Sequence, residues 1–331
     1  MLRFDLRAPP SGAPAAELYR AALDVAEWGE RQGCLAIQVS EHHGADDGYL
    51  PAPLVLAAAL AGRTRRVPIQ VAALLAPLHD PIELAEQMAV LDLASGGRVS
   101  YVLALGYRPA EYAMFGRDFS ARGRRLEACI AALRRAWTGE PFEFEGRPVR
   151  VTPRPATPGG PPLFLGGGSP AAVRRAARLG LGMVTQGGDP SLAAIYRTEC
   201  AKHGRAPGLF IDPPPGTVTS AFVAEDVDAA WARLGPYLLH DARAYAAWMG
   251  EGHAATKSAA SSVGELRAEA GPYRIFTPDE AVAYVRERGP LLLQPLCGGL
   301  PPALAWEHLE LLEKRVLPAL GPAPRAGGAP A

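Results

Sequence analysis

The feature of this sequence that most constrains its fold is a regular alternation of short apolar runs with helical patterns. Such runs are typical of buried strands, and parallel strands need a crossover helix between them. The eight predicted strands cover residues 2–7, 34–40, 67–75, 99–106, 162–167, 181–186, 216–223 and 291–296. The pattern therefore predicts an α/β fold, a parallel sheet closed as a (β/α)8 TIM barrel. An open doubly wound sheet is the alternative, and it is disfavoured because no GxGxxG turn follows the first strand.

Capping signals mark several of the predicted helices. The helices are predicted at 15–32, 81–95, 124–138 and 170–180. Two of them begin with an N-cap residue followed by proline, Asp80-Pro81 and Ser169-Pro170. An N-cap side chain accepts from free helical N–H groups, and proline is tolerated at the first helical position because its missing N–H is not needed there.

Two departures from regular alternation interrupt a single predicted domain over residues 1–320. Residues 140–151 predict a β-hairpin insertion after the fourth helix, and residues 224–290 predict a long insertion between the seventh and eighth strands. The tail 321–331 is rich in Pro, Gly and Ala and is expected to be disordered.

Composition excludes several classes of protein. The 331 residues are 48% hydrophobic and 21% charged, which is enough to bury a large core. Lys+Arg and Asp+Glu are both 34, so the whole-chain charge predicts no binding to nucleic acid or to an anionic membrane. No apolar stretch reaches 18 residues, so no membrane span is expected. The four cysteines are far apart, which favours free thiols in a reducing cytoplasm over disulfides or a metal site.

The strongest functional signal is Glu41-His42-His43, at the carboxyl end of the second predicted strand. Parallel α/β folds place their chemistry at this edge of the sheet, and imidazole titrates near neutral pH. A metal site is disfavoured because adjacent strand residues point to opposite faces. The structural alternative is a strand end with His43 packed into the loop and Glu41 in solvent.

A second signal is the turn Gly166-Gly-Gly-Ser169, which leaves a strand and enters a helix. Free N–H groups and the helix dipole at this position favour an anion, and glycines allow it to approach closely. Three glycines alone would also fit a simple strand–helix turn.

Five segments in order resemble the bacterial luciferase-like, flavin-dependent monooxygenase family. The matching segments are 41–43, 77–98, 106–116, 162–180 and 309–320. The resemblance implies a barrel with reduced FMN bound at the carboxyl ends of the strands. It also implies that His42 faces the flavin and is catalytic together with Glu41, and that His43 lies at the pocket wall.

The resemblance also assigns cofactor contacts. A non-proline cis peptide under the flavin ring is expected at Val71–Ala72, in the third strand. The phosphate is expected at the glycine turn, and contacts are also expected after the fourth strand. These residues are Gly167, Gly168, Ser169, Leu105, Gly106 and Arg108.

Two positions depart from the family pattern. Leu105 stands where many relatives have an arginine for the flavin phosphate, and Ala172 stands where others have a threonine. Arg108 or the Tyr107 hydroxyl is the candidate replacement. Each lost charge-assisted hydrogen bond would cost on the order of 1.5–3 kcal/mol, so the sequence leaves weak FMN binding or a deazaflavin open.

The resemblance implies a monooxygenase that delivers one atom of dioxygen to a small organic substrate through a flavin hydroperoxide. A separate flavin reductase would supply reduced FMN, and a homodimer would form through the helix at 81–95. The alternatives are a deazaflavin-dependent hydride-transfer enzyme on the same barrel and a non-catalytic flavin-binding relative.

Overall fold

A curled parallel sheet forms the centre of the molecule in a computed structural model that describes residues 1–187, 189–214, 216–249 and 257–321. Seven strands pair in the order β1-β2-β3-β4-β7-β8-β9, and every pair is parallel. Their bounds are β1 (Leu2–Phe4), β2 (Ile37–Val39), β3 (Ile69–Leu74), β4 (Val99–Leu103), β7 (Leu163–Gly166), β8 (Gly182–Val184) and β9 (Phe210–Ile211). All seven carboxyl ends consequently lie along one edge.

A second parallel pair continues the sheet beyond β1. The strands β10 (Ser220–Val223) and β11 (Tyr273–Phe276) pair with each other. Leu293 forms single-residue bridges to both Leu2 and Ala221, and so joins β1 to β10. Among the described residues, no pairing joins β9 to β10 or β11. The parallel, curled α/β architecture predicted from the sequence is confirmed.

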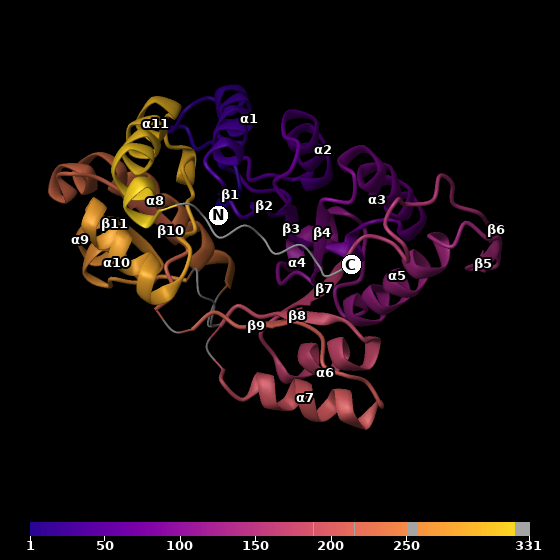
Figure 1. Ribbon diagram of the computed structural model, residues 1–331. Helices are drawn as coiled ribbons and strands as arrows, with labels where there is room; N and C mark the ends of the chain where they lie inside the picture. The colour runs from indigo at the N-terminus through magenta and orange to yellow at the C-terminus, as the bar shows by residue number, and fades with distance from the viewer. Residues whose placement is uncertain (188, 215, 250–256, 322–331) are drawn as a thin grey trace.

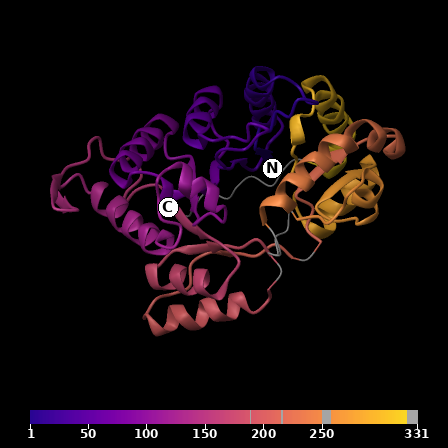
Figure 2. The same ribbon diagram turned by 180° about the vertical axis from the view of Figure 1, so that it is seen from behind.

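Helices cover the outside of this sheet (Figures 1 and 2). Those between the first strands are α1 (Ala15–Arg31), α2 (Pro53–Arg63), α3 (Pro81–Ser95), α4 (Pro109–Met114) and α5 (Arg122–Ala136). The others are α6 (Pro170–Leu179), α7 (Leu192–Lys202), α8 (Val227–Met249), α9 (Val263–Ala268), α10 (Pro278–Arg288), α11 (Pro302–Leu311) and α12 (Leu317–Leu320). No helix of the described chain is long and apolar enough to cross a membrane.

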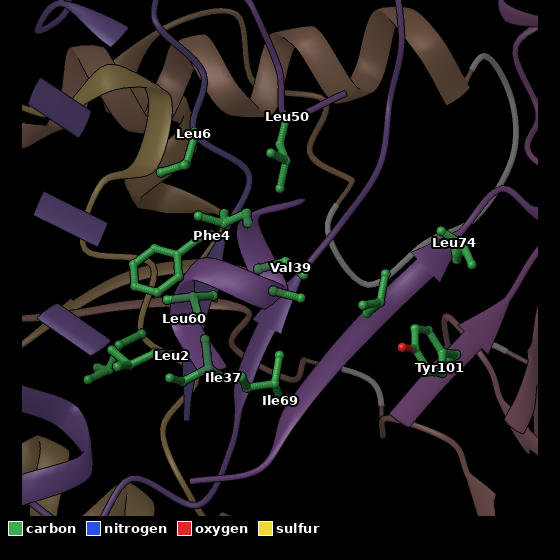
Figure 3. Packing of buried hydrophobic residues seen from close by; sticks show 14 of the residues in the cluster. Leu2, Phe4, Leu6, Ile37, Val39, Leu50, Leu60, Ile69, Leu74 and Tyr101 are labelled. Carbon is green, nitrogen blue, oxygen red and sulfur yellow. The ribbon is translucent and has the colours of Figure 1, made fainter. Parts of the chain in front are cut away.

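The core is built from strand residues that align in register. Leu2 lies opposite Ile37, and Ile37 lies opposite Ile69 in the next strand. All three are almost fully buried, and Leu60 of α2 is buried in the same cluster (Figure 3). Burying one such side chain contributes roughly 1.5–3 kcal/mol, so this row helps to fix the strand order.

The predicted helix caps are present. The Asp80 carboxylate accepts from the N–H groups of Ile82 and Glu83, at 2.8 and 3.2 Å. Gly96 ends α3 in the left-handed region, with a φ of 66°, as glycine allows at little cost. The Ser169 hydroxyl accepts from the Ala172 N–H at 3.2 Å and opens α6.

The sheet differs from the prediction in three places. The run 291–296 supplies only the Leu293 bridges, because Pro290 and Pro295 lack the N–H groups that a longer ladder needs. The interval 224–290, predicted as an insertion, contains the strand β11, which was not predicted. The strand β9 was missed because its two residues are too few to show a period.

The predicted hairpin is observed as β5 (Phe142–Phe144) paired antiparallel with β6 (Arg147–Val149). Glu145 and Gly146 form its turn, with φ values of 49° and 72°. The predicted disordered tail lies outside the described residues except for Gly321.

His308 links α11 to the sheet and gives the fold a pH dependence. Its Nδ1 accepts from the Val223 N–H at 2.9 Å, and the side chain is almost fully buried. Burial lowers the pKa of His308 to about 3. The folded state therefore holds the imidazole neutral, and stability present above pH 6.5 is lost as the pH falls toward 3.

We expect this histidine alone to remove roughly 3 kcal/mol of stability between neutral pH and pH 4. His308→Asn keeps an oxygen acceptor for the Val223 N–H but cannot be protonated in this range. Urea unfolding at pH 7 and pH 4 should show a smaller pH effect for this variant than for wild type. His203→Asn, which replaces a partly exposed histidine, is the control and should lose as much stability between pH 7 and pH 4 as wild type does. An equal loss of stability in all three proteins would contradict the assignment to His308.

Candidate active site

The candidate active site lies where the segments after β1, β2 and β4 meet the C-terminal part of α8. Glu41-His42-His43 follows β2, as predicted, and all three side chains are buried. Tyr107 follows β4, and Arg7 follows β1. Tyr49 from the loop after β2, and Tyr245 and Trp248 from α8, complete the surroundings of His42.

Glu41 ties the ends of two strands together. Its Oε1 accepts from Nε2 of both His43 and His79, each at 2.8 Å, and its Oε2 accepts from the Leu75 N–H at 2.5 Å. Burial acts to raise the pKa of Glu41, but these donors outweigh it and lower the pKa to about 2. Glu41 is thus an ionised anchor between β2 and β3, and the alternative of a solvent-exposed Glu41 is wrong.

His42 forms a pair with a carboxylate that the sequence did not single out. Its Nδ1 lies 2.8 Å from Oε1 of Glu111, in the first turn of α4. Glu111 also accepts from the His43 N–H at 3.0 Å, which fixes its position. Burial lowers the pKa of His42, and the hydrogen bond to Glu111 only partly offsets this. The imidazole is therefore neutral at pH 7.

The hydrogen bonds of His42 define its tautomer. An acceptor-only carboxylate at Nδ1 requires the proton to be on that nitrogen, which leaves a lone pair on Nε2. The Tyr107 hydroxyl lies 3.0 Å from Nε2 and donates to it. Nε2 of His42 is thus a basic atom at the carboxyl edge of the sheet.

Four aromatic rings surround this imidazole. The ring centroids of Trp248, Tyr49, Tyr107 and Tyr245 lie 4.8, 4.9, 5.3 and 6.5 Å from that of His42. They leave His42 only 6% exposed. Water is largely excluded, so electrostatic interactions at Nε2 are stronger than they would be in solvent.

The glycine turn forms a separate part of the candidate site. A Cβ added to Gly168 would meet no atom within 4 Å, so open space lies beside it. No hydrogen bond between described residues uses the N–H of Gly168 or Ser169. A Cβ on Gly166 would lie 3.4 Å from the Cβ of Ala104, which places the turn beside the end of β4. Free donors, open space and the start of α6 together suit an anion.

The cis peptide predicted in the third strand is displaced by one residue. It joins Ala72 to Ala73, and the predicted position, Val71–Ala72, is wrong. Val71 remains in a regular ladder opposite Tyr101, and the register shifts only between Ala72 and Leu74. Val71 is fully buried in the core. Ala72 and Ala73 are half-buried, and their side chains are small.

The residues after β4 lie close to His42. Gly106 has a φ of 70°, and its added Cβ would lie 3.8 Å from Oε2 of Glu111. Arg108 donates to the His43 carbonyl at 2.8 Å and to Glu111 at 3.1 Å. The Leu105 carbonyl accepts from the Tyr112 hydroxyl at 2.5 Å.

The two candidate replacements for the missing arginine, Tyr107 and Arg108, therefore both lie at the His42 cluster. No hydrogen bond within the described chain links either of them to the glycine turn.

Glu111→Gln is expected to lower turnover by about tenfold or more while the protein stays folded. The amide oxygen can still accept from His42, but its neutral charge stabilises a protonated imidazole less. Since Glu111 raises the pKa of His42, this pKa should fall in the variant, and NMR titration of His42 measures it. Glu127→Gln, in a partly exposed ion pair with Arg175 far along the chain from His42, is the control. If the pKa of His42 is unchanged in Glu111→Gln, Glu111 does not stabilise the protonated imidazole and the pairing is contradicted.

The curled parallel sheet carries an imidazole–carboxylate pair and a glycine turn at its carboxyl edge, which is where parallel α/β proteins place their binding and catalytic residues. The chain belongs to the luciferase-like monooxygenase family, whose model matches residues 2–283.

Solved structures of related proteins share the fold. The chain superimposes on monooxygenase RslO1 from Streptomyces bottropensis with a TM-score of 0.75 and 24% identity, covering 96% of this chain and 98% of that one. The oxygenating constituent of 3,6-diketocamphane monooxygenase from Pseudomonas putida, solved in complex with FMN, has a TM-score of 0.68 and 20% identity, over 96% and 97%.

Sequence similarity to curated proteins covers a smaller part of the chain. The chain is 29% identical over 161 residues to the oxygenase component of the flavin-dependent trigonelline monooxygenase of Acinetobacter baylyi. That match covers 46% of this chain and 44% of the relative, so the chain spans about half the length of the curated relatives it matches.

Proposed function

We propose that this protein is a flavin-dependent monooxygenase that uses reduced FMN and dioxygen to oxygenate a small organic substrate. The observation that carries the proposal is the neutral His42, held by Glu111 and enclosed by aromatic rings at the carboxyl edge of the sheet. Family membership and the flavin dependence named for the trigonelline enzyme support it.

The residues present suit FMN. The open space beside Gly168 and the N–H groups of Gly168 and Ser169 would take the phosphate. The half-buried Ala72 and Ala73 would let a flat ring lie against β3, with Gly106 at the next strand. When bound, reduced FMN would supply the electrons that activate dioxygen.

The protein's own residues would control protons and water. Nε2 of His42 would accept or return a proton, Glu111 would hold the tautomer, and Tyr107 would occupy the same hydrogen bond in the resting state. Tyr49, Tyr245 and Trp248 would keep water from the reacting atoms. Imidazole is suited to this role because its unperturbed pKa lies near neutral pH.

Anaerobic titration followed by oxygen addition tests the proposal. Reduced FMN should bind, and each bound flavin should consume one dioxygen when the solution is aerated. Tight binding of a reduced deazaflavin, with hydride transfer that needs no oxygen, would favour the alternative cofactor. Binding of FMN without any change in its rate of reaction with oxygen would favour a non-catalytic flavin carrier.

A separate flavin reductase is the proposed partner. The trigonelline relative is named as an oxygenase component, which implies a second component for that enzyme. Addition of a flavin reductase and its nicotinamide donor should therefore sustain turnover by this protein.

We also propose a homodimer through α2 and α3, the second of which is the helix predicted at 81–95. Ala85 and Ala89 are fully buried within one subunit, so they cannot form the interface, whereas Ala94 is exposed. The large exposed apolar side chains on these two adjacent helices are Val55, Val90 and Leu93, which are 71%, 52% and 45% exposed.

Val90→Lys is expected to convert this dimer to a monomer at micromolar concentration. The new ammonium group would also face Glu86 one turn earlier on α3, so the subunit itself should keep its stability within about 0.5 kcal/mol. Sedimentation velocity measures the change. Leu209→Lys, at an exposed apolar side chain near β9, should leave the sedimentation coefficient unchanged. A wild-type protein that sediments as a monomer would reject the interface.

A further inference from the structure

Arg7 lies in the segment that follows β1, and its guanidinium is fully buried. Its Nε donates to Oδ1 of Asp241 in α8, at 2.7 Å. Its Nη1 donates to Oδ2 of Asp47, in the loop after β2, at 2.6 Å. One side chain therefore joins the first strand, the loop that follows Glu41-His42-His43, and the long helix α8.

The same guanidinium lies against the rings that surround His42. Its Cζ is 4.4 Å from the ring centroid of Trp248 and 4.7 Å from those of Tyr49 and Tyr245. A cation over an aromatic face is attracted by the ring, and the attraction is stronger where water is excluded. Arg7 and His42 thus share three aromatic neighbours.

Other hydrogen bonds hold these rings in the same arrangement. The Tyr245 hydroxyl accepts from Arg3 at 2.6 Å and lies 2.9 Å from the Tyr49 hydroxyl. Asp241 also accepts from the Tyr273 hydroxyl at 2.7 Å. The indole of Trp248 contacts a second guanidinium, since Cζ of Arg108 is 4.2 Å from its ring centroid.

We infer that Arg7 is a positioning residue for the chemistry at His42. Its planar fork fixes α8 through Asp241 and the loop through Asp47, and its face fixes the three rings that enclose the imidazole. A lysine would supply the charge but not the fork or the flat face. This inference rests on the proposed function, because it takes Nε2 of His42 as the reacting base.

The charged and titratable groups around His42 determine the pKa that an NMR titration of His42 would measure. They are Arg7 after β1, Tyr49 after β2, Tyr107 after β4, Arg108 and Glu111 at α4, and Tyr245 in α8. Burial lowers the pKa of His42 most, Glu111 raises it, and the charges of Arg108 and Arg7 lower it further. Loss of the Arg7 charge should therefore raise this pKa.

Two variants separate the fork from the charge. Arg7→Lys keeps the charge and loses the geometry. Arg7→Met removes the charge as well as the fork. Arg233→Met, in an exposed ion pair with Glu307, is the matched control.

The experiment measures turnover with reduced FMN, thermal stability, and the NMR titration of His42 in flavin-free protein. We expect Arg7→Lys to lower turnover tenfold to a hundredfold, on the order of the loss caused by small misplacements, with a His42 titration close to wild type. Arg7→Met should lose turnover and show a raised pKa of His42, because the Arg7 charge lowers that pKa in the wild type. The control should match wild type in all three measurements.

Wild-type turnover in Arg7→Lys would overturn the inference, because the fork would then be unnecessary. A folded Arg7→Met protein with an unchanged His42 titration would also overturn it and leave Arg7 as a purely structural ion. If Arg7→Met does not fold, Arg7→Lys alone decides. The His42 titration needs no flavin, so it tests the inference independently of the proposed activity. If the proposed monooxygenase activity is wrong, the wild-type protein itself will show no turnover.

Discussion

His42→Ala is expected to lower turnover by about 10²–10⁴-fold while the protein remains folded. Nε2 of His42 is the basic atom that the structure orients toward Tyr107, and alanine leaves no group in its place. The loss should appear mainly in kcat, because the contacts proposed for the phosphate lie at the glycine turn and stay intact. Single-turnover kinetics with reduced FMN and dioxygen measures the effect directly.

Two comparisons make this result interpretable. His203→Ala removes a partly exposed histidine from the end of α7 and should leave the rate unchanged. His42→Asn fills more of the space between Tyr49 and Trp248 than alanine does, so a similar loss in both variants would point to the lost base rather than to a cavity. Wild-type turnover in folded His42→Ala would exclude His42 from the mechanism.

Gly168→Asp is expected to weaken FMN binding by at least about a hundredfold. The new carboxylate would occupy the open space beside Gly168 and would repel a phosphate from the N–H groups there. Isothermal titration of oxidised FMN measures the change. The fold should tolerate the side chain, because an added Cβ meets no neighbour.

Gly264→Asp is the control for this variant. Gly264 lies in the first turn of α9, also with open space around an added Cβ, and an acidic side chain is favourable at a helix start. It should bind FMN as wild type does. If Gly168→Asp also binds FMN normally, the phosphate lies elsewhere or flavin is not the ligand.

Local sequence patterns predicted those parts of the fold that depend on near neighbours. The caps Asp80 and Ser169 act on N–H groups two or three residues away, so their residue types and spacing were sufficient. The strand ladder near Leu293 was not predictable in this way. The apolar run 291–296 predicted a strand, but its pairing depends on the distant Leu2 and Ala221, and Pro290 and Pro295 lack the N–H groups that a longer ladder needs.

The same distinction applies to the site. Glu41-His42-His43 was found because three titratable residues close one strand. The partners of His42 come from elsewhere: Glu111 lies 69 positions along the chain, and Trp248 lies in an interval read as an insertion. Glu111 carried a weak signal, since it follows Arg108-Pro109 in a segment that resembles the family, but nothing in the spacing pairs it with His42.

The position of Leu293 has a consequence for how this protein is made. Its bridges give the free edge of β1 a partner only after residue 293 has been synthesised, long after β1 itself. Until then β1 presents unpaired backbone groups, which are the usual template for association between nascent chains. The pairing of Leu293 with Leu2 also joins residues that are very distant in sequence, and such contacts form slowly. The vulnerable stage of biosynthesis therefore lasts until Leu293 has left the ribosome, and chains truncated ahead of residue 290 should aggregate rather than persist as folded fragments.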